Sequence, residues 1–167
     1  LSQVVSRELG EARVRREKNE AREALRASEL RFRTLTELLP VGVNLADKDG
    51  KLLYANQKWL EMTGLKMDDA LTDGWINALH PADRDAVIQA WRSVIETGNQ
   101  MRIEYRFQNE GGNITDVLGI SNVLNDESGT LAGIIGVNID MTERKRADAE
   151  LRQSQASLLE SQRSARI

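Results

Sequence analysis

The fold is decided by the stretch Met101-Arg102-Ile103-Glu104-Tyr105-Arg106-Phe107, in which apolar and charged side chains alternate without a break. Successive side chains of a β-strand point to opposite faces of its sheet. The stretch therefore predicts a strand with one buried face and one face toward water. Such a strand is typical of antiparallel sheets that are covered on one side.

Two more strands are predicted downstream. A turn at residues 110–113 contains two glycines and leads into residues 114–124, and a second turn at 125–129 ends in glycine and leads into residues 130–140. Clusters of Asn, Asp, Ser and Gly between apolar runs mark turns that connect strands. The second half of the domain is therefore predicted to be three consecutive antiparallel strands.

A β-hairpin is predicted upstream of these strands. Residues 41–46 alternate apolar with small or polar side chains, residues 47–50 form a turn that ends in glycine, and residues 51–55 form the returning strand. With the three later strands, this hairpin predicts an α+β domain. We expect a five-stranded antiparallel sheet with short helices on one face.

The segment between the hairpin and the later strands predicts helices. Asn56 is placed to cap a short helix that ends at Gly64. A longer helix is predicted to begin with Pro81 as its first residue and Asp83 in its first turn, and to end at Gly98.

Charged segments with helical spacing flank this domain. Apolar residues recur at coiled-coil steps of four and three in both flanks. These seam positions are Val14, Ala21, Leu25, Phe32 and Leu35 in the first flank and Leu151 and Leu158 in the second. We predict that the seams pair two copies into a parallel coiled-coil homodimer. The predicted parts are an N-terminal helix at 1–35, a compact domain at 36–141 and a C-terminal helix at 142–167.

Composition argues against several classes of function. Residues 36–140 carry eight Lys and Arg against sixteen Asp and Glu, and basic residues in the flanks alternate with acidic ones, so nucleic-acid binding is not predicted. No apolar run approaches the roughly 18–20 residues of a membrane span, so no membrane insertion is predicted. One histidine, no cysteine and no Gly-rich phosphate loop predict neither a metal site nor a catalytic centre.

A series of short motifs follows one another from about residue 31 to residue 146. They are Leu30-Arg31-Phe32-Arg33, Tyr54-Ala55-Asn56, Met62-Thr63-Gly64, His80-Pro81-Ala82-Asp83-Arg84, Glu104-Tyr105-Arg106, the strand at 133–137, and Asp140-Met141-Thr142-Glu143-Arg144-Lys145. In this order they resemble a PAS domain of the sensory type found in histidine kinases and other signalling proteins, with flanking signalling helices. Two departures stand out: Met141 replaces the family's Ile, and Asp116 and Val117 stand where the family often has Trp.

The resemblance implies a sensory module. It implies detection of a small ligand or a partner, and relay of a conformational signal through the coiled-coil helices to an effector such as a histidine kinase. An adjacent PAS or kinase domain of the same chain is the expected partner. We therefore expect a non-catalytic segment of a longer, cytoplasmic signalling protein. The alternative is a ligand-free module that dimerises and spaces other domains, its pocket filled by its own side chains.

Six residues are candidates for lining a pocket between sheet and helices. They are Asn44, Trp75, Trp91, Tyr105, Ser121 and Asn138. The three small polar residues lie within predicted strands, where they either bond a ligand or face water. Trp91 lies on the apolar stripe of its helix, which favours core packing. Trp75 lies in the segment expected to roof the pocket.

No cofactor is predicted. Flavin photosensors of this fold form an adduct with a helical cysteine, and this chain has no cysteine. Haem sensors of the fold use a histidine on the long helix as an axial ligand. Here the single histidine, His80, stands immediately before Pro81 and is predicted to cap the helix. The ligand, if there is one, stays unidentified.

The end of the last strand is the predicted signal relay, formed by Asp140, Met141, Thr142, Glu143 and Arg106. Asp140 and Glu143 have the spacing of a capping box, and Thr142 offers a second hydroxyl cap. By analogy with the family, Arg106 is the first candidate for pairing with Asp140. A weakly packed outgoing helix is predicted to tilt or rotate when the last strand is strained.

Overall fold

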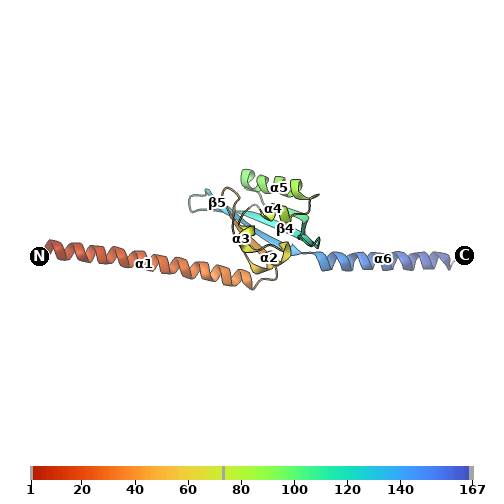
Figure 1. Ribbon diagram of the computed structural model, residues 1–167, viewed down its shortest axis with the longest axis horizontal. Helices are drawn as coiled ribbons and strands as arrows, with labels where there is room; N and C mark the ends of the chain where they lie inside the picture. Colours follow the sequence, from red (N-terminus) through yellow and green to blue (C-terminus); the bar gives the residue numbers. More distant parts are fainter. Residues whose placement is uncertain (1, 73, 166–167) are drawn as a thin grey trace. The chain divides into compact units, whose positions relative to one another are not determined.

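The computed structural model describes residues 2–72 and 74–165. The chain divides into two compact units, Leu1–Leu39 and Pro40–Ile167. Figure 1 shows the order of the helices and strands along the chain. Among the described residues, no helix combines the length and the apolar character that a bilayer span requires.

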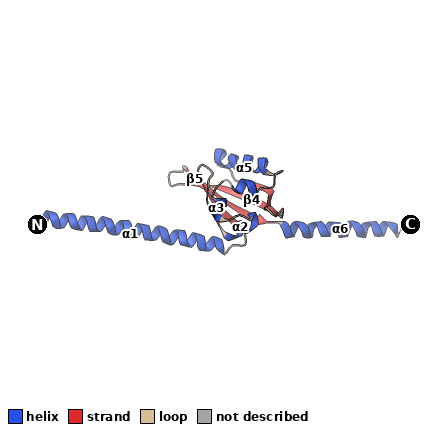
Figure 2. Cartoon of the chain, viewed as in Figure 1, coloured by secondary structure: helices blue, strands red, loops and turns tan. Residues whose placement is uncertain are grey.

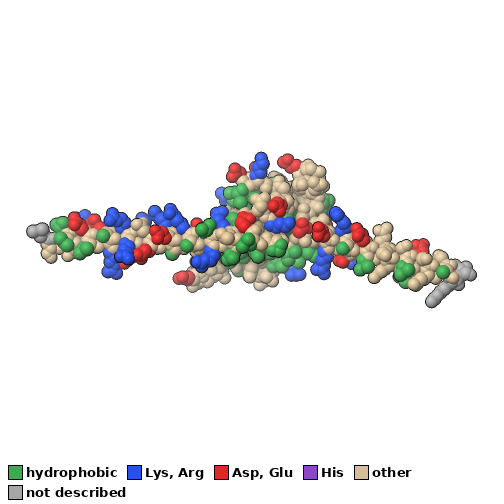
Figure 3. All heavy atoms as spheres, turned by 90° about the horizontal axis from the view of Figure 1, so that it is seen from below, with side chains coloured by type: hydrophobic (Ala, Val, Ile, Leu, Met, Phe, Trp, Pro, Cys, Tyr) green, Lys and Arg blue, Asp and Glu red, His purple; other side chains and the backbone are tan. Residues whose placement is uncertain are grey.

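The first unit is the long helix α1 (Ser2–Glu37). Ion pairs one turn apart join Arg7 to Glu11, Arg13 to Glu17 and Arg16 to Glu20 at 2.8–2.9 Å. Figure 3 shows the resulting mixture of basic and acidic side chains along this helix. Exposed ion pairs of this kind contribute about 0.3–0.5 kcal/mol each. They stabilise the helix itself and do not indicate what it binds.

The second unit is built on five strands in the order β2-β1-β5-β4-β3, with every neighbouring pair antiparallel. The strands are β1 (Gly42–Asp47), β2 (Leu52–Ala55), β3 (Met101–Gln108), β4 (Ile114–Asn125) and β5 (Leu131–Asp140). Figure 2 shows them as one sheet. The predicted α+β class and five-stranded antiparallel sheet are confirmed. The last strand in sequence lies at the centre, so the sheet is complete only when β5 has inserted between β1 and β4.

Four helices lie between β2 and β3 in sequence and pack on one face of the sheet (Figure 1). They are α2 (Gln57–Thr63), α3 (Met67–Ala70), α4 (Gly74–Ala78) and α5 (Arg84–Thr97). The predicted cap at Asn56 is confirmed, since its side-chain oxygen accepts from the backbone N–H of Trp59 at 3.0 Å and also from that of Val43 at 2.8 Å. Gly64 ends α2 with φ of 73°.

The predicted start of the longer helix is wrong. Helix α5 begins at Arg84, so Pro81 and Asp83 lie before its first turn. Asp83 is the N-cap residue but makes no side-chain cap bond. Its carboxylate instead accepts from the backbone N–H and the guanidinium of Arg106 at 2.8–2.9 Å. A charged partner on β3 outcompetes the neutral helix N–H groups.

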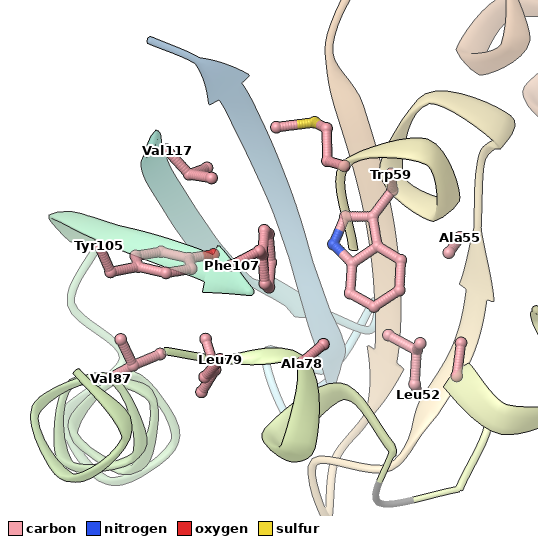
Figure 4. Packing of buried hydrophobic residues seen from close by; sticks show 11 residues of the cluster. Leu52, Ala55, Trp59, Ala78, Leu79, Val87, Tyr105, Phe107 and Val117 are labelled. Atoms are coloured by element: carbon pink, nitrogen blue, oxygen red, sulfur yellow. The ribbon is translucent and has the colours of Figure 1, made fainter. Parts of the chain in front are cut away.

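Aromatic side chains form the centre of the core between the sheet and the helices. Figure 4 shows Phe107 between Tyr105 of the same strand and Trp59 of α2. The Phe107 ring meets both neighbours edge to face, with centroids 5.3 Å from Tyr105 and 5.9 Å from Trp59. A second buried cluster around Val94 and Ile134 continues the core beneath α5. The alternation in β3 is confirmed, because its apolar residues face this core and its charged residues do not.

Helix α6 (Thr142–Ser164) follows β5 after one residue. None of its described residues is buried in the single chain. The seam residues Leu151 and Leu158 are 58% and 60% exposed, and Val14, Leu25 and Leu35 on α1 are 58–64% exposed. These apolar side chains are thus available to a partner, and whether they form a coiled coil stays a prediction.

Candidate functional site

A small cavity lies between the inner face of the sheet and the helices. Its volume is about 30 Å³. It is lined by Asn44, Leu52, Trp59, Trp75, Val87, Trp91, Met101, Tyr105, Phe107, Ser121 and Asn138. All six residues that the sequence proposed for the pocket lie around this one cavity, although each comes from a different helix or strand.

The sheet side of the cavity is polar. Asn44 on β1 and Ser121 on β4 both pair with Gly136 of β5, which lies between them. Asn138, two residues further along β5, pairs with Gly119 of β4. Directly paired residues of a sheet share a face. The three polar side chains are therefore grouped on the inner face, across three adjacent strands.

Two glycines make room for this group. A Cβ built on Gly119 would lie 2.6 Å from Cε1 of Tyr105, and one built on Gly136 would overlap the amide of Asn44. Real side chains do not approach so closely. Glycine at these two positions therefore lets Tyr105 and Asn44 lie flat against the sheet.

Tyr105 and Asn138 are joined inside the cavity. The Tyr105 hydroxyl donates to Oδ1 of Asn138 at 3.0 Å, and both side chains are buried. Burial raises the pKa of the Tyr105 hydroxyl well above its ordinary value, because the phenolate would lose its hydration. The hydroxyl therefore stays protonated and fixes the orientation of the Asn138 amide.

The helix side of the cavity is aromatic. The rings of Trp75 on α4 and Trp91 on α5 lie 5.2 Å apart at 49°. Trp91 also covers the turn between β1 and β2, where a Cβ on Gly50 would meet its ring at 2.7 Å. Both tryptophans are partly exposed and both line the cavity. Trp91 thus serves the predicted core packing and the cavity wall together.

The size and chemistry of the cavity bear on the cofactors of related sensors. About 30 Å³ is the room of one or two water molecules. With the side chains as they lie, the residues present do not fit a flavin ring system. His80 is not among the lining residues, and its Nδ1 accepts from the backbone N–H of Ala82 at 3.2 Å. It therefore shapes the turn before α5 and does not line the cavity, but the predicted role as the helix cap is wrong, because the N-cap residue is Asp83.

A second group of polar contacts ties the start of α6 to β4. The backbone N–H of Asp116 donates to the Thr142 hydroxyl at 3.0 Å, and its carbonyl accepts from the N–H of Met141 at 2.7 Å. The Asp116 carboxylate accepts from Lys145 at 3.2 Å, and Lys145 also reaches Glu104 of β3 at 3.1 Å. These two carboxylates raise the pKa of Lys145 above its ordinary value. We call this group, Glu104, Asp116, Met141, Thr142 and Lys145, the output junction.

The predicted capping box at this junction is replaced by a different arrangement. Asp140 accepts from the N–H of Thr142 at 2.9 Å, so it does cap the turn into α6. Glu143 makes no side-chain hydrogen bond with the described residues and does not return to Asp140. The Thr142 hydroxyl is occupied by β4 rather than by its own helix. The helix start is thus anchored across the sheet.

The predicted pairing of Arg106 with Asp140 is wrong. Arg106 binds both carboxylate oxygens of Asp83 at 2.8–2.9 Å, on the segment before α5. This pair lowers the pKa of Asp83 below its ordinary value. The backbone carbonyl of Arg106 also accepts from the N–H of His80 at 2.9 Å. Arg106 therefore fixes the helical layer to the sheet, and in the β3–β4 register it lies opposite Asp116 of the output junction.

Sequence reasoning missed several residues of these sites. Asp116 was noted only as a departure from the family pattern, and that departure was the available signal: an acidic residue in a strand needs a partner. Lys145 was one of many charges on a predicted helix and gave no signal of its own. Gly119 and Gly136 were visible as glycines within strands, which often mark a close approach of another group.

The geometry can be compared with known proteins. A family model described as the PAS fold matches residues 52–138, just over half of the 167-residue chain. Over 128 residues the chain is 36% identical to the uncharacterized protein y4lL of Sinorhizobium fredii, covering 77% of this chain and 16% of that protein. Over 117 residues it is 30% identical to a blue-light-activated histidine kinase of Brucella anthropi, covering 70% of this chain and 23% of that protein. The chain thus spans less than a quarter of the length of these two relatives.

A solved structure supports the same fold. The chain superposes on the PAS domain of a protein from Colwellia psychrerythraea with a TM-score of 0.58 and 18% sequence identity, covering 68% of this chain and 98% of that one. At this level of identity the likeness concerns the fold alone.

Proposed function

The chain belongs to the PAS fold family, and from this premise we propose that it is a sensory module that detects a small ligand or partner and relays a conformational signal to an effector such as a histidine kinase. One observation carries the proposal. Strand β5 lines the cavity with Asn138 and, after Asp140, leads directly into α6. A change at the cavity therefore has a short covalent path to the outgoing helix.

The output junction supports a relay that does not require unfolding. Its contacts are hydrogen bonds and ion pairs between partly exposed groups, with the side chains of Lys145 43% and Asp116 26% exposed. Water can replace such contacts at small net cost. A displacement of β5 relative to β4 is then expected to break the contacts at Met141 and Thr142 and to release the start of α6.

We propose that the flanking helices act as a parallel homodimer. In the single chain, Val14, Leu25 and Leu35 on α1 and Leu151 and Leu158 on α6 are more than half exposed, whereas Phe32 is partly buried. Pairing two copies would bury these stripes and align the two copies of α6. An adjacent PAS or kinase domain of the same chain would then receive the rotation or shift of the helices.

The relay is tested at Thr142. Thr142→Val keeps the shape of the side chain but cannot accept from the Asp116 N–H, whereas Thr142→Ser keeps the hydroxyl and is the matched control. With a histidine kinase domain joined after residue 167, we expect altered autophosphorylation in the valine variant and an unchanged level in the serine variant. Equal autophosphorylation in the wild type and both variants would show that no signal passes through this junction.

A second candidate function is favoured by the small volume of the cavity, which the protein's own side chains nearly fill. In that case the domain is a ligand-free dimerisation and spacer module. It would bind no small molecule, and changes at the junction would leave the output of a joined kinase constant.

A further inference from the structure

We infer that the cavity is a binding site for a small uncharged molecule with an aromatic body and a carboxamide-type polar group, and that the molecule takes the place of the Trp75 side chain. The inference rests on the proposed sensory function and names the class of ligand. Three observations carry it. The cavity holds unpaired buried polar groups, its described lining residues carry no charge, and the Trp75 side chain lines both the cavity and a groove on the surface.

The polar groups on the sheet are buried but not all are paired. Asn44, Ser121 and Asn138 are 8%, 5% and 4% exposed. Asn138 uses its carbonyl oxygen for Tyr105, while its amide nitrogen, the Asn44 amide and the Ser121 hydroxyl have no hydrogen-bond partner among the described residues. Among the described residues, every side-chain polar atom that is fully shielded from solvent has a hydrogen-bond partner. The unpaired atoms of these three lining residues are therefore not fully shielded, and the cavity gives access to them. Buried polar groups are normally paired, so a bound molecule or water must meet them.

These unpaired groups offer both donors and acceptors within a small area. The two amides donate through their nitrogens, the Asn44 amide oxygen accepts, and the serine hydroxyl does both. A carboxamide has the complementary set, with an N–H₂ donor and a carbonyl acceptor on one planar group. An alkane or a simple ether would leave the donors unpaired, which costs free energy in a buried site.

Charge separates this ligand class from its alternatives. None of the described residues that line the cavity carries a charge, and Tyr105 stays protonated. A carboxylate brought into this site would lose its hydration without gaining a counter-ion, and the same holds for an ammonium group. The cavity is therefore selective for neutral molecules.

The aromatic wall indicates where the ligand enters and what it displaces. Trp75 and Leu52 line the cavity on one side and an open surface groove on the other. The groove is formed by Asp49, Gly50, Lys51, Leu71 and Thr72 together with these two residues. If Trp75 turns outward, the slot beside Trp91 opens to the groove and has the shape of a flat ring. An aromatic ring in that slot would restore the tilted ring contact that Trp75 now makes with Trp91.

The test uses benzamide and benzoate, which have the same size and differ in charge. Binding to the full chain and to Trp75→Ala is measured by titration calorimetry, with the indole N–H signals of Trp59 and Trp91 followed by NMR. We expect benzamide to bind the variant at least tenfold more tightly than the wild type, and benzoate to bind each protein at least tenfold more weakly than benzamide. Adding Asn44→Leu to Trp75→Ala should weaken benzamide at least fivefold.

Several results would overturn the inference. Equal affinity for benzamide and benzoate would show that the cavity does not discriminate against charge. If benzamide does not bind to a folded Trp75→Ala variant, the cavity is not a binding site of the proposed kind. If Trp75→Ala does not fold, the wild type decides alone, since saturating benzamide must shift the indole signals of Trp75 and Trp91 while benzoate must not. The Thr142 test of the relay needs no ligand, so a failure there and a failure of binding are distinguishable.

Discussion

Two neighbouring regions at one end of strands β3, β4 and β5 are held together by different forces: Phe107 pairs with Thr115, the residue before Asp116 of the output junction. Behind the helices, Phe107 is 2% exposed and packs its ring between Tyr105 and Trp59. At the output junction, Thr142 and Lys145 are joined to Asp116 by hydrogen bonds at 3.0 and 3.2 Å, and water reaches these groups. The first region depends on volume and shape, and the second on the direction of a few polar contacts.

The difference indicates how one small domain can be stable and still transmit a change. A change in the volume of a buried side chain strongly lowers the stability of the fold, because the protein interior is packed as densely as an organic crystal. Half-exposed polar contacts have alternatives in water and cost little to exchange. We therefore expect substitutions in the core to unfold the domain and substitutions at the junction to change helix α6 alone.

The largest effect is expected from Phe107→Ala. The substitution removes a fully buried ring and leaves a cavity between Tyr105 and Trp59, which should lower the free energy of unfolding by about 3–5 kcal/mol. Urea denaturation followed by tryptophan fluorescence measures this loss. A loss below about 1 kcal/mol, typical of surface positions or compliant sites, would contradict the central place given to this ring.

A smaller loss is expected from Gly119→Ala. The new methyl group would lie 2.6 Å from the Tyr105 ring, so the ring must move and the domain should lose about 1–3 kcal/mol. Gly10→Ala is the matched control, because no atom lies within 4 Å of its Cβ position in α1. Should both variants unfold at the wild-type urea concentration, the close packing of Tyr105 on the sheet would be refuted.

Asp83→Asn tests the ion pair that joins the helical layer to the sheet. The side chains of Arg106 and Asp83 are 36% and 20% exposed, so solvent screening weakens their attraction. We expect the substitution to lower the free energy of unfolding by about 1 kcal/mol at pH 7. Arg106 lowers the pKa of Asp83 in the folded protein. The stabilisation is therefore complete above the unfolded pKa of about 3.9 and is lost as the pH falls through the lowered folded value.

The measurement for this pair is the difference in unfolding free energy between wild type and Asp83→Asn across pH. The difference should be constant from pH 7 to about pH 5 and shrink below about pH 4. A difference that instead grows as the pH falls would show that the carboxylate is not held in its charged form.

At the output junction, Asp140→Ala should cost about 0.5 kcal/mol, at the low end for the loss of a helix cap. The domain should stay folded, while amide hydrogen exchange across residues 142–160 becomes faster. Asp148→Ala is the control, since its side chain makes no hydrogen bond with the described residues. Identical exchange in both variants would show that Asp140 does not hold the start of α6.

The smallest effect on stability is expected at the seam of α1. Val14→Asp combined with Leu25→Asp should change the unfolding free energy of the Pro40–Ile167 unit by less than about 0.5 kcal/mol, because both positions are exposed in the single chain. Light scattering should nevertheless report monomers in place of dimers. Leu30→Asp lies outside the seam and should leave the dimer intact; a dimer that survives the double substitution would place the contact elsewhere.

Much of the fold was predictable from local patterns. The alternation from Met101 to Phe107, the turns that contain Gly112 and Gly129, and the cap at Asn56 each express a preference of a few neighbouring residues. The polar residues Asn44, Ser121 and Asn138 were also identified, because polar side chains in strands are unusual enough to be noticed one at a time. The start of α5 was misplaced because Asp83 has a charged partner more than twenty residues away.

The sequence by itself determined the elements, their order and the residue types available to a pocket, since hydrophobic period, turn chemistry and capping are local. Tertiary structure alone decided that β5 lies between β1 and β4, because strand order depends on which apolar faces bury each other across long loops. That placement brings Asn44 and Ser121 to either side of Gly136 and sets Asp116 against Thr142. Neither meeting has a local signal, since each joins residues far apart in the chain through the register of a central strand.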